Sequence, residues 1–282
     1  MGTLSRFLTE YGALSRVLEP RDLFALAVCT ATHAPEILRS RKLTGLDAAM
    51  SRNVTVRFAN SQVVLPLADI DQILSIHEDN PTFGNLREIY ARDCYLQCLK
   101  LRTPVRSVLD LGANRGMFSV LALVALGADV VIGVEPAPIY EPVARLLFEA
   151  NHCDSNRWFR YTKFVSGVTG EQQDSARKIS IQTILREQGI SRFNLVKIDI
   201  EGDEKQIFDE PDWLTSVDTI TMEIHPQFVA DLSGIPRALE RYGFHYVIVD
   251  QAGNPASLAK GMFLYASCSG TIRKPESTCH PR

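Results

Sequence analysis

The amino-acid sequence predicts an α/β fold built on a mostly parallel sheet. From residue 105 onward, short apolar runs alternate with helical stretches, which is typical of βαβ units. The last two apolar runs, at residues 244–250 and 261–265, have only a loop between them, and we expect them to form an antiparallel hairpin. Before residue 104 the pattern is of a different kind and predicts an N-terminal extension of helices and one β-hairpin.

The N-terminal extension is expected to begin with amphipathic helices. Residues 3–18 carry apolar side chains on one helical stripe that ends before Pro20, and further helices are expected at residues 23–31 and 37–38. Apolar and polar residues then alternate with a period of two on both sides of a turn at residues 59–61, which predicts a β-hairpin over residues 54–65. Helical patterns return at residues 69–78 and 85–101.

The alternating part of the chain predicts the remaining elements in order. Strands are expected at residues 107–111, 130–134, 160–165, 195–200 and 219–224, and helices at residues 117–126, 140–151, 180–188 and 204–208. We therefore divide the chain into an N-terminal extension at residues 1–103, a core at residues 104–266 and a loose tail at residues 267–282. The extension is expected to act as a lid over the core and to shape a pocket for a substrate.

Composition excludes several classes of protein. Of the 282 residues, 45% are hydrophobic and 22% are charged, as in soluble globular proteins and unlike disordered, collagen-like or coiled-coil chains. The net charge of −3 argues against nucleic acid as a partner.

The longest early apolar run, residues 23–29, is too short for a membrane span, so we expect no membrane partner and a cytoplasmic location. Six widely spaced cysteines are expected to be reduced thiols. No sequence feature indicates an oligomeric state.

The strongest local motif lies at residues 108–116. An apolar strand is followed by Asp110 and by a turn that contains Gly112, Asn114 and Gly116, after which a helix begins. A turn that binds a dinucleotide has a middle glycine where this chain has Asn114, and a carboxylate fits poorly beside a pyrophosphate. The motif instead suits a ligand with an ammonium group, such as the methionine end of S-adenosylmethionine. A plain turn between a strand and a helix is the structural alternative.

A second acidic residue lies at the end of the next expected strand. Glu135, followed by Pro136, comes 25 positions after Asp110. A carboxylate at this strand end is placed to accept hydrogen bonds from both hydroxyls of a ribose, and it repels a 2′-phosphate. A solvated charge at the strand end is the alternative interpretation of Glu135.

Together, these motifs resemble the FkbM-type family of S-adenosylmethionine-dependent methyltransferases. The resemblance rests on DLGANRG at residues 110–116, on Glu135-Pro136, on ISIQTIL at residues 179–185 and on LVKIDIEG at residues 195–202. It extends over residues 104–265 and leaves the first hundred residues outside. It implies a class I methyltransferase (Rossmann-like) fold with a seven-stranded sheet, and S-adenosyl-L-methionine as the cofactor. It also implies O-methylation of a small-molecule hydroxyl acceptor, such as a sugar or a polyketide-type compound of natural product biosynthesis.

One position departs from the common pattern. After the third strand, many class I methyltransferases have an acidic residue that binds the adenine amino group. This chain has Val165-Ser166-Gly167 there. Ser166 or backbone groups are therefore expected to take the adenine contacts.

The segment at residues 197–202 is expected to bring charged groups to the cofactor. Lys197, Asp199 and Glu201 alternate with apolar residues and would share one face of a strand. Ligands of open α/β sheets bind outside the carboxyl ends of the strands. We expect Asp199 to contact the cofactor and to take part in catalysis, and Glu201 to contact a ligand or to help deprotonate the acceptor. A structural Lys197–Asp199 ion pair is the alternative. Two carboxylates alone do not predict a metal site.

The next expected strand ends with Glu223 and His225 on one face. The pKa of a histidine lies near working pH, so His225 is the candidate base that takes the proton from an acceptor hydroxyl. A hydrogen-bonded structural histidine is the alternative interpretation.

Other classes of function remain open beside methyl transfer. One is a catalytically silent methyltransferase-like binding module, and another is a nicotinamide-dependent oxidoreductase, which would need the missing middle glycine. RNA methylation is disfavoured because the basic residues near position 40 are dispersed and form no basic face.

Overall fold

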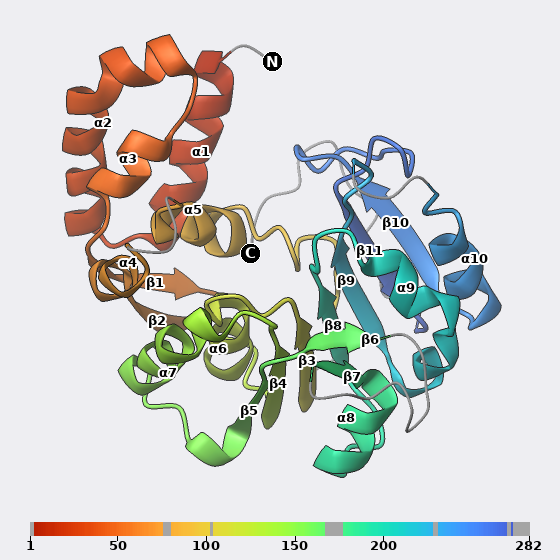
Figure 1. The fold of residues 1–282 in the computed structure, drawn as a ribbon. Coiled ribbons are helices and arrows are strands. Elements are labelled where there is room, and N and C mark those ends of the chain that lie inside the picture. The colour runs from red at the N-terminus through yellow and green to blue at the C-terminus, as the bar shows by residue number, and fades with distance from the viewer. Residues whose placement is uncertain are drawn as a thin grey trace.

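The computed structural model describes residues 3–75, 80–101, 104–166, 177–227, 231–269 and 272, and it has the α/β fold that the sequence predicts. A seven-stranded sheet has the strand order β10-β11-β9-β8-β3-β4-β5 (Figure 1). Strands β5, β4, β3, β8 and β9 are parallel, and β11 is antiparallel to both of its neighbours, so the expected C-terminal hairpin is confirmed. The strands are β3 (Ser107–Leu111), β4 (Val130–Val134), β5 (Trp158–Tyr161), β8 (Leu195–Ile198), β9 (Thr219–Glu223), β10 (His245–Val249) and β11 (Phe263–Ser267).

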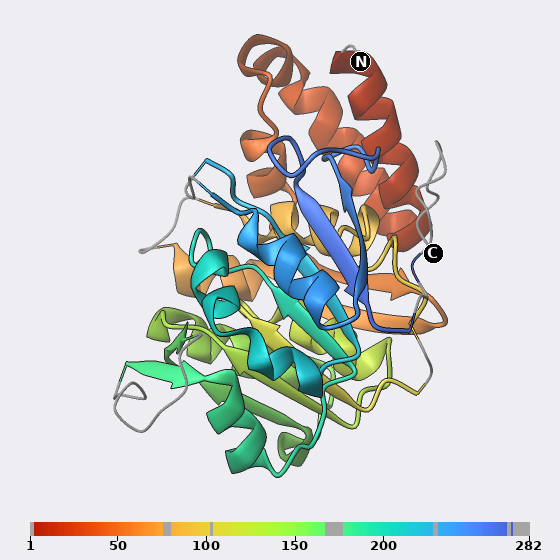
Figure 2. The ribbon, with the colours of Figure 1, turned by 90° about the vertical axis from the view of Figure 1, so that its right-hand side faces the viewer.

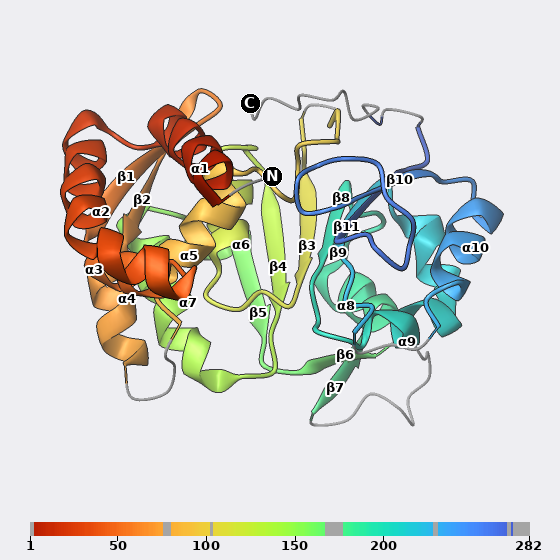
Figure 3. The ribbon, with the colours of Figure 1, turned by 90° about the horizontal axis from the view of Figure 1, so that it is seen from above.

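Both faces of the sheet are covered, which explains why its strands are nearly continuous apolar runs. Figure 3 shows α6 and α7 together with the N-terminal elements on one side of the sheet, and α8, α9 and α10 on the other. Alternate residues of β3 enter different cores: Val108 packs with the first group of helices, and Leu109 and Leu111 with the second. The helices are α6 (Met117–Val124), α7 (Glu141–Ala150), α8 (Ile181–Gln188), α9 (Glu204–Asp209) and α10 (Gly234–Arg241).

The N-terminal elements pack on the α6–α7 side (Figures 1 and 2). The expected hairpin is confirmed, with Phe58 opposite Ser61 across its turn. It is joined to α7 by Asn151, whose side chain accepts from the N–H of Val64 (2.8 Å) and donates to its carbonyl (2.7 Å). The elements are α1 (Thr3–Val17), α2 (Pro20–Ser40), α3 (Thr44–Ala49), β1 (Asn53–Phe58), β2 (Ser61–Pro66), α4 (Leu67–Leu74), α5 (Thr82–Leu86) and the π-helix η1 (Arg87–Ala91).

Two helix predictions in this region are wrong. The pair expected at residues 23–31 and 37–38 is one helix, α2, which continues through Pro35. The helix expected over residues 85–101 ends at Ala91, because Asp93 takes a left-handed φ of 52° and the chain turns. The apolar residues after this turn are buried without a helix: Tyr95, for example, makes edge contacts with Phe118 and Phe263.

The prediction of one strand over residues 160–165 is also wrong. The segment divides between β5 of the main sheet and β6 (Phe164–Ser166), which pairs in parallel with β7 (Lys178–Ser180) in a separate two-stranded sheet. Ser166 therefore ends a strand outside the main sheet. At the C-terminus, β11 extends to Ser267, so this residue is strand rather than tail, and Ile272 forms a bridge with Leu99. Most of the expected tail lies outside the described residues.

Candidate functional site

The turn between β3 and α6 has a backbone that requires glycine. Gly112 has a φ of 72°, and a Cβ atom there would lie 1.6 Å from the carbonyl oxygen of Asp199 on the neighbouring strand end. Gly116 has a φ of 85° and lies against Ala144 of α7. Asn114 also takes a left-handed φ, of 45°. This turn therefore lies in direct contact with the end of β8.

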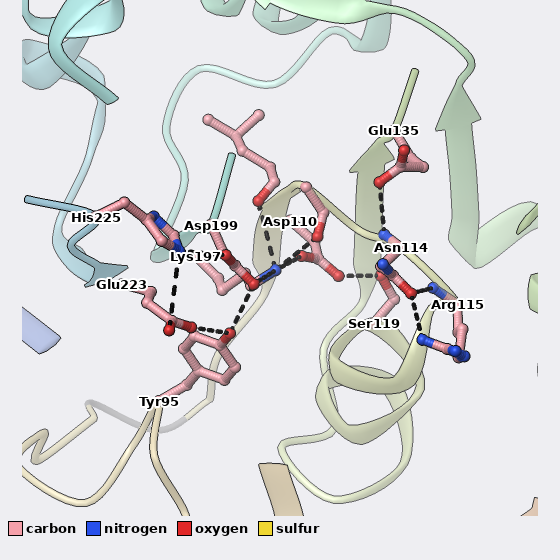
Figure 4. Close-up of polar contacts among 12 residues, drawn as sticks. Tyr95, Asp110, Asn114, Arg115, Ser119, Glu135, Lys197, Asp199, Glu223 and His225 are labelled. Atoms are coloured by element: carbon pink, nitrogen blue, oxygen red, sulfur yellow. Dashed lines mark hydrogen bonds and ion pairs between the residues drawn. The ribbon is translucent and has the colours of Figure 1, made fainter. Parts of the chain in front are cut away.

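Asp110 is fully buried under this turn (Figure 4). In the register of the sheet it lies between Gly133 of β4 and Lys197 of β8. Its Oδ2 accepts a hydrogen bond from Ser119 Oγ (2.6 Å), and its Oδ1 lies 3.3 Å from Lys197 Nζ. Within the chain itself, the charge of Asp110 is thus balanced by a lysine. Contact of Asp110 with a ligand's ammonium group stays a prediction.

Lys197 links the turn to the end of β8. Its Nζ donates to the carbonyl of Gly112 (2.7 Å) and lies 3.4 Å from Asp199 Oδ2. Burial lowers the pKa of Lys197, but the charges of Asp110 and Asp199 outweigh burial and leave the pKa raised. Lys197 is therefore charged at neutral pH, and the structural ion pair considered for Lys197 and Asp199 is present.

Glu135 supports the turn from the end of β4. Its two carboxylate oxygens accept from the backbone N–H groups of Asn114 and Ala137, each at 2.9 Å, and only 7% of the residue is exposed. The neighbouring Pro136 is half-buried. Each carboxylate oxygen keeps a second lone pair, and contact of Glu135 with ribose hydroxyls stays a prediction.

The ends of β8 and β9 bring Asp199, Glu223 and His225 together (Figure 4). His225 Nε2 lies 3.8 Å from Asp199 Oδ1 and 3.9 Å from Glu223 Oε1. The hydroxyl of Tyr95 donates to the other oxygen of each carboxylate, Asp199 Oδ2 (2.8 Å) and Glu223 Oε2 (3.3 Å). We call Asp199, Glu223 and His225 the strand-end cluster.

The electrostatics of the strand-end cluster shift the pKa of two of its groups. Burial and the nearby charge of Asp199 raise the pKa of Glu223 to about 7. Burial lowers the pKa of His225, but the hydrogen bond and charge of Glu204 outweigh it and leave the pKa raised. Burial also raises the pKa of the Tyr95 phenol well above its ordinary value, so this residue acts as a neutral hydrogen-bond donor.

The expected position of Glu201 on the same face as Asp199 is not what the structure shows. Strand β8 ends at Ile198, and Glu201 lies exposed in a turn with a φ of 50°. The alternation of side chains holds only while the backbone stays extended, so it fails beyond the strand end. The fully buried carboxylate of this segment is Glu204, whose Oε1 lies 2.5 Å from His225 Nδ1. A catalytic role of Glu201 stays a prediction.

Two residues of the site carried no sequence signal. Glu204 is in the first turn of a short helix, and Tyr95 lies in the turn segment that had been predicted as helix. Tyr95 is 104 residues away from Asp199 in the chain, and no local pattern indicates such a contact. Of the other predicted residues, Gly112, Asn114, Gly116 and Glu135 lie around the turn, whereas Ser166 ends the separate strand β6.

The described residues therefore place acidic groups and one imidazole along the carboxyl ends of four neighbouring strands, β9, β8, β3 and β4. Carboxylates and an imidazole can bind cationic groups and accept protons. None of the helices in the described part of the chain is both long and apolar enough to cross a bilayer.

Comparison with solved structures finds similar chains at low sequence identity. The methyltransferase FkbM from Methylobacillus flagellatus KT is 12% identical over 71% of this chain and 58% of its own, with a TM-score of 0.43. The ribosomal protein L11 methylase from Lactobacillus delbrueckii subsp. bulgaricus is 14% identical over 57% of this chain and 68% of its own, with a TM-score of 0.35. The human methyltransferase 10 domain containing protein is 13% identical over 59% of this chain and 72% of its own, with a TM-score of 0.38.

Comparison with protein families finds a match within the core. No curated protein matches the chain. Residues 110–246, from within β3 into β10, match the family described as the methyltransferase FkbM domain. The matched range contains the glycine turn, Glu135 and the strand-end cluster, and it confirms the resemblance found in the sequence. Over this range the chain is therefore similar to methyltransferases of the FkbM family.

Proposed function

We propose that the chain transfers a methyl group from S-adenosyl-L-methionine to a hydroxyl of a small molecule, such as a sugar or a polyketide-type compound. The observation that carries this proposal is the row of functional groups along one edge of the sheet. Glu135 and the glycine turn lie at the ends of β4 and β3, and the strand-end cluster lies at the ends of β8 and β9. A cofactor site and a group of proton acceptors thus adjoin each other.

The chemistry of these residues fits S-adenosyl-L-methionine better than a dinucleotide. Asp110, Glu135, Asp199 and Glu223 all bear carboxylates, and Lys197 is already engaged by two of them. A sulfonium and an ammonium group are stabilised beside such a set, whereas a pyrophosphate is repelled. The side chain at position 114 is an asparagine, where a dinucleotide turn needs its middle glycine. We assign Glu135 to the ribose and the turn to the methionine end, with Ser166 toward the adenine.

Once the cofactor is bound, it supplies an activated methyl carbon and its own sulfur leaving group. The remaining task of the chain is to align the acceptor oxygen and to take its proton. As the oxygen–carbon bond forms and the carbon–sulfur bond breaks, the hydroxyl proton passes to the strand-end cluster and from there to water. His225 and Glu223 are the groups of the cluster suited to accept it.

The N-terminal extension contributes to this site. Tyr95, which follows η1, reaches both carboxylates of the strand-end cluster and is itself buried. Neither the helices nor the hairpin before residue 104 lie within the matched family range. We assign acceptor selection to this region, because specificity resides in segments added to a shared fold.

Titration calorimetry with S-adenosylhomocysteine tests the cofactor assignment. Glu135→Gln keeps the shape of the side chain but removes the charge and one acceptor oxygen that serve the ribose hydroxyls, so affinity should fall at least about tenfold. Glu149→Gln, on the exposed side of α7, is the matched control and should bind as the parent chain does. Equal affinity of the parent chain and Glu135→Gln for S-adenosylhomocysteine would refute the assignment of Glu135 to the ribose.

A labelling experiment tests the reaction itself. An extract of small molecules is incubated with the protein and an isotope-labelled methyl donor, and the labelled products are identified by mass spectrometry. A labelled methyl ether is the expected product. Binding of S-adenosylhomocysteine without labelled product would favour a silent binding module, and binding of NADH in its place would favour an oxidoreductase.

A further inference from the structure

We propose that the strand-end cluster of Asp199, Glu223 and His225 is a binding site for a divalent transition-metal cation, for which Mn²⁺ is the best-fitting ion. Three potential ligand atoms, one from each side chain, lie within 4.8 Å of one another. Binding of the ion is independent of the proposed function. Only its role, to hold the acceptor oxygen, rests on the proposed methyl transfer.

The distances within the cluster suit a shared ion. His225 Nε2 lies 3.8 Å from Asp199 Oδ1 and 3.9 Å from Glu223 Oε1, which is too long for hydrogen bonds between them. Ligand bonds of about 2.1 Å place two ligand atoms about 3 Å apart at right angles and about 4 Å apart across the ion. Small rotations of the two carboxylates would therefore bring all three atoms into a first coordination sphere.

The second polar atom of each ligand is already held by an outer partner, as is common for metal ligands. His225 Nδ1 faces the buried Glu204 at 2.5 Å, which directs Nε2 toward the two carboxylates. The hydroxyl of Tyr95 donates to Asp199 Oδ2 and to Glu223 Oε2, which turns Oδ1 and Oε1 toward the imidazole. All three ligand atoms are thus oriented by residues that lie outside the ligand set.

The charges around the cluster also favour a cation. Four carboxylates lie close to two basic side chains. Lys197 is near Asp110 and Asp199. His225 is near Asp199, Glu204 and Glu223. Asp110 and Glu204 are fully buried, so their charges are poorly screened by solvent. When Glu223 is ionised as a ligand, Lys197 and a charged His225 together balance two of the four negative charges, and a divalent ion offsets the other two.

The donor set also indicates the ion and the substrate class. Carboxylates suit Mg²⁺ and Mn²⁺, and an imidazole suits the transition metals, so Mn²⁺ satisfies both kinds of ligand.

Three protein ligands leave three positions of an octahedron open. Two neighbouring oxygens of an acceptor can occupy two of them, and coordination lowers the pKa of the hydroxyl that is methylated. With the ion bound, His225 and Glu223 act as ligands in place of their role as bases, and the hydroxyl proton passes to water. We infer that the acceptor is a compound with two adjacent oxygens, such as a vicinal diol.

Titration of the full chain with Mn²⁺ tests the site, with the electron paramagnetic resonance signal of the free aqua ion as the readout. The parent chain should bind one ion. Asp199→Asn and Glu223→Gln should each weaken binding at least about tenfold, and Glu204→Gln about 10- to 100-fold through the orientation of His225. Asp209→Asn, an exposed carboxylate on the same helix as Glu204, is the matched control and should bind as the parent does.

Two outcomes would overturn the metal site. One is the absence of binding by the parent chain at about 1 mM Mn²⁺. The other is unchanged affinity in both Asp199→Asn and Glu223→Gln. Circular dichroism establishes that each variant is folded. Should a variant fail to fold, pulsed resonance of the Mn²⁺-loaded parent decides, because a ligated imidazole gives a nitrogen coupling and its absence refutes ligation by His225.

A parallel titration with S-adenosylhomocysteine separates the two proposals. Cofactor binding without Mn²⁺ binding overturns the metal site and leaves the proposed methyl transfer in place. Mn²⁺ binding without cofactor binding overturns the methyl transfer and leaves the metal site in place.

Discussion

Individual residues of the turn after β3 are constrained by contact as well as by conformation. Gly112, Asn114 and Gly116 all have positive φ angles, of 72°, 45° and 85°. Asparagine tolerates this region, and glycine adopts it without steric cost. At Gly112 the constraint is stronger, because the carbonyl of Asp199 occupies the place of a side chain. The glycine therefore sets the distance between the turn and the strand-end cluster.

Gly112→Ala should destabilise the chain far more than a positive φ alone would. Gly127→Ala is the matched control, since Gly127 has a φ of 69° and no atom within 4 Å of its Cβ position. The control should lower the free energy of unfolding by about 1 kcal/mol. Gly112→Ala should cost at least about 3 kcal/mol, because backbone must move as well. Urea denaturation measures both, and equal losses would contradict the close approach to Asp199.

At the scale of elements, α1 is fixed to η1 by a group of partly buried charges. Glu10 of α1 accepts hydrogen bonds from Arg87 (2.8 Å) and Arg92 (3.0 Å). Arg87 also donates two bonds to Asp47 of α3, at 2.9 and 2.7 Å. Burial raises the pKa of Glu10, but the two arginines outweigh it and hold the pKa below its ordinary value of 4.5. The charged form of Glu10 thus stabilises the N-terminal region.

Glu10→Gln should lower the free energy of unfolding by about 2–3 kcal/mol at pH 7, because it leaves two arginines partly unpaired. The folded-state pKa of Glu10 is lowered, so its contribution is complete above 4.5 and is lost as the pH falls through the folded-state pKa. The difference in the free energy of unfolding between the parent chain and Glu10→Gln should therefore become smaller below about pH 4.5. Guanidinium denaturation at several pH values measures it.

Glu36→Gln serves as the control for this pH series, since Glu36 is exposed on α2. Its stability should stay within about 0.5 kcal/mol of the parent chain. A constant difference between the parent chain and Glu10→Gln from pH 7 to pH 3 would show that the charge of Glu10 does not act as described.

Elements differ in how well their sequence predicts them. Strands β3 and β4 have the predicted bounds, because a buried parallel strand is a short apolar run between breaks. Periodicity failed where a single backbone angle ended an element. Asp93 turns the chain after η1, within a helical pattern that continues to residue 101, and Glu201 turns it after β8, at the end of the alternation that begins at Lys197. A left-handed φ at one residue costs little free energy, so the local sequence does not predict where it occurs. Tertiary contacts decide whether the residue adopts it.

At the scale of the whole molecule, the site combines segments that are far apart in the chain. The positions of Asp110, Gly112 and Glu135 could be predicted, because these residues lie at or just after the carboxyl ends of β3 and β4. The rest of the site could be predicted only in part. Asp199 and His225 follow strands, but the contacts of Tyr95 and Glu204 arise from packing of the N-terminal region and of α9 against the sheet.

The same packing predicts that the N-terminal extension and the core unfold together. Buried residues of α1, of the hairpin and of α6 and α7 form one continuous cluster. Two units that share a core lose its burial energy together, so calorimetry should show one transition whose calorimetric and van't Hoff enthalpies agree. Two separate transitions would show that residues 1–103 and 104–266 are independent domains.

Asn151→Ala sharpens this prediction, because it removes the bonds that join α7 to β2. The side chain bonds both backbone groups of Val64, at 2.8 and 2.7 Å, and its loss should cost about 1–2 kcal/mol. If the two parts are coupled, the single transition moves to lower temperature as a whole. Asn254→Ala breaks hydrogen bonds only to Asp250, within the loop between β10 and β11, and is the control for loss of an asparagine side chain. A transition that splits in Asn151→Ala, and stays single in Asn254→Ala, would place the boundary between two cooperative units at this contact.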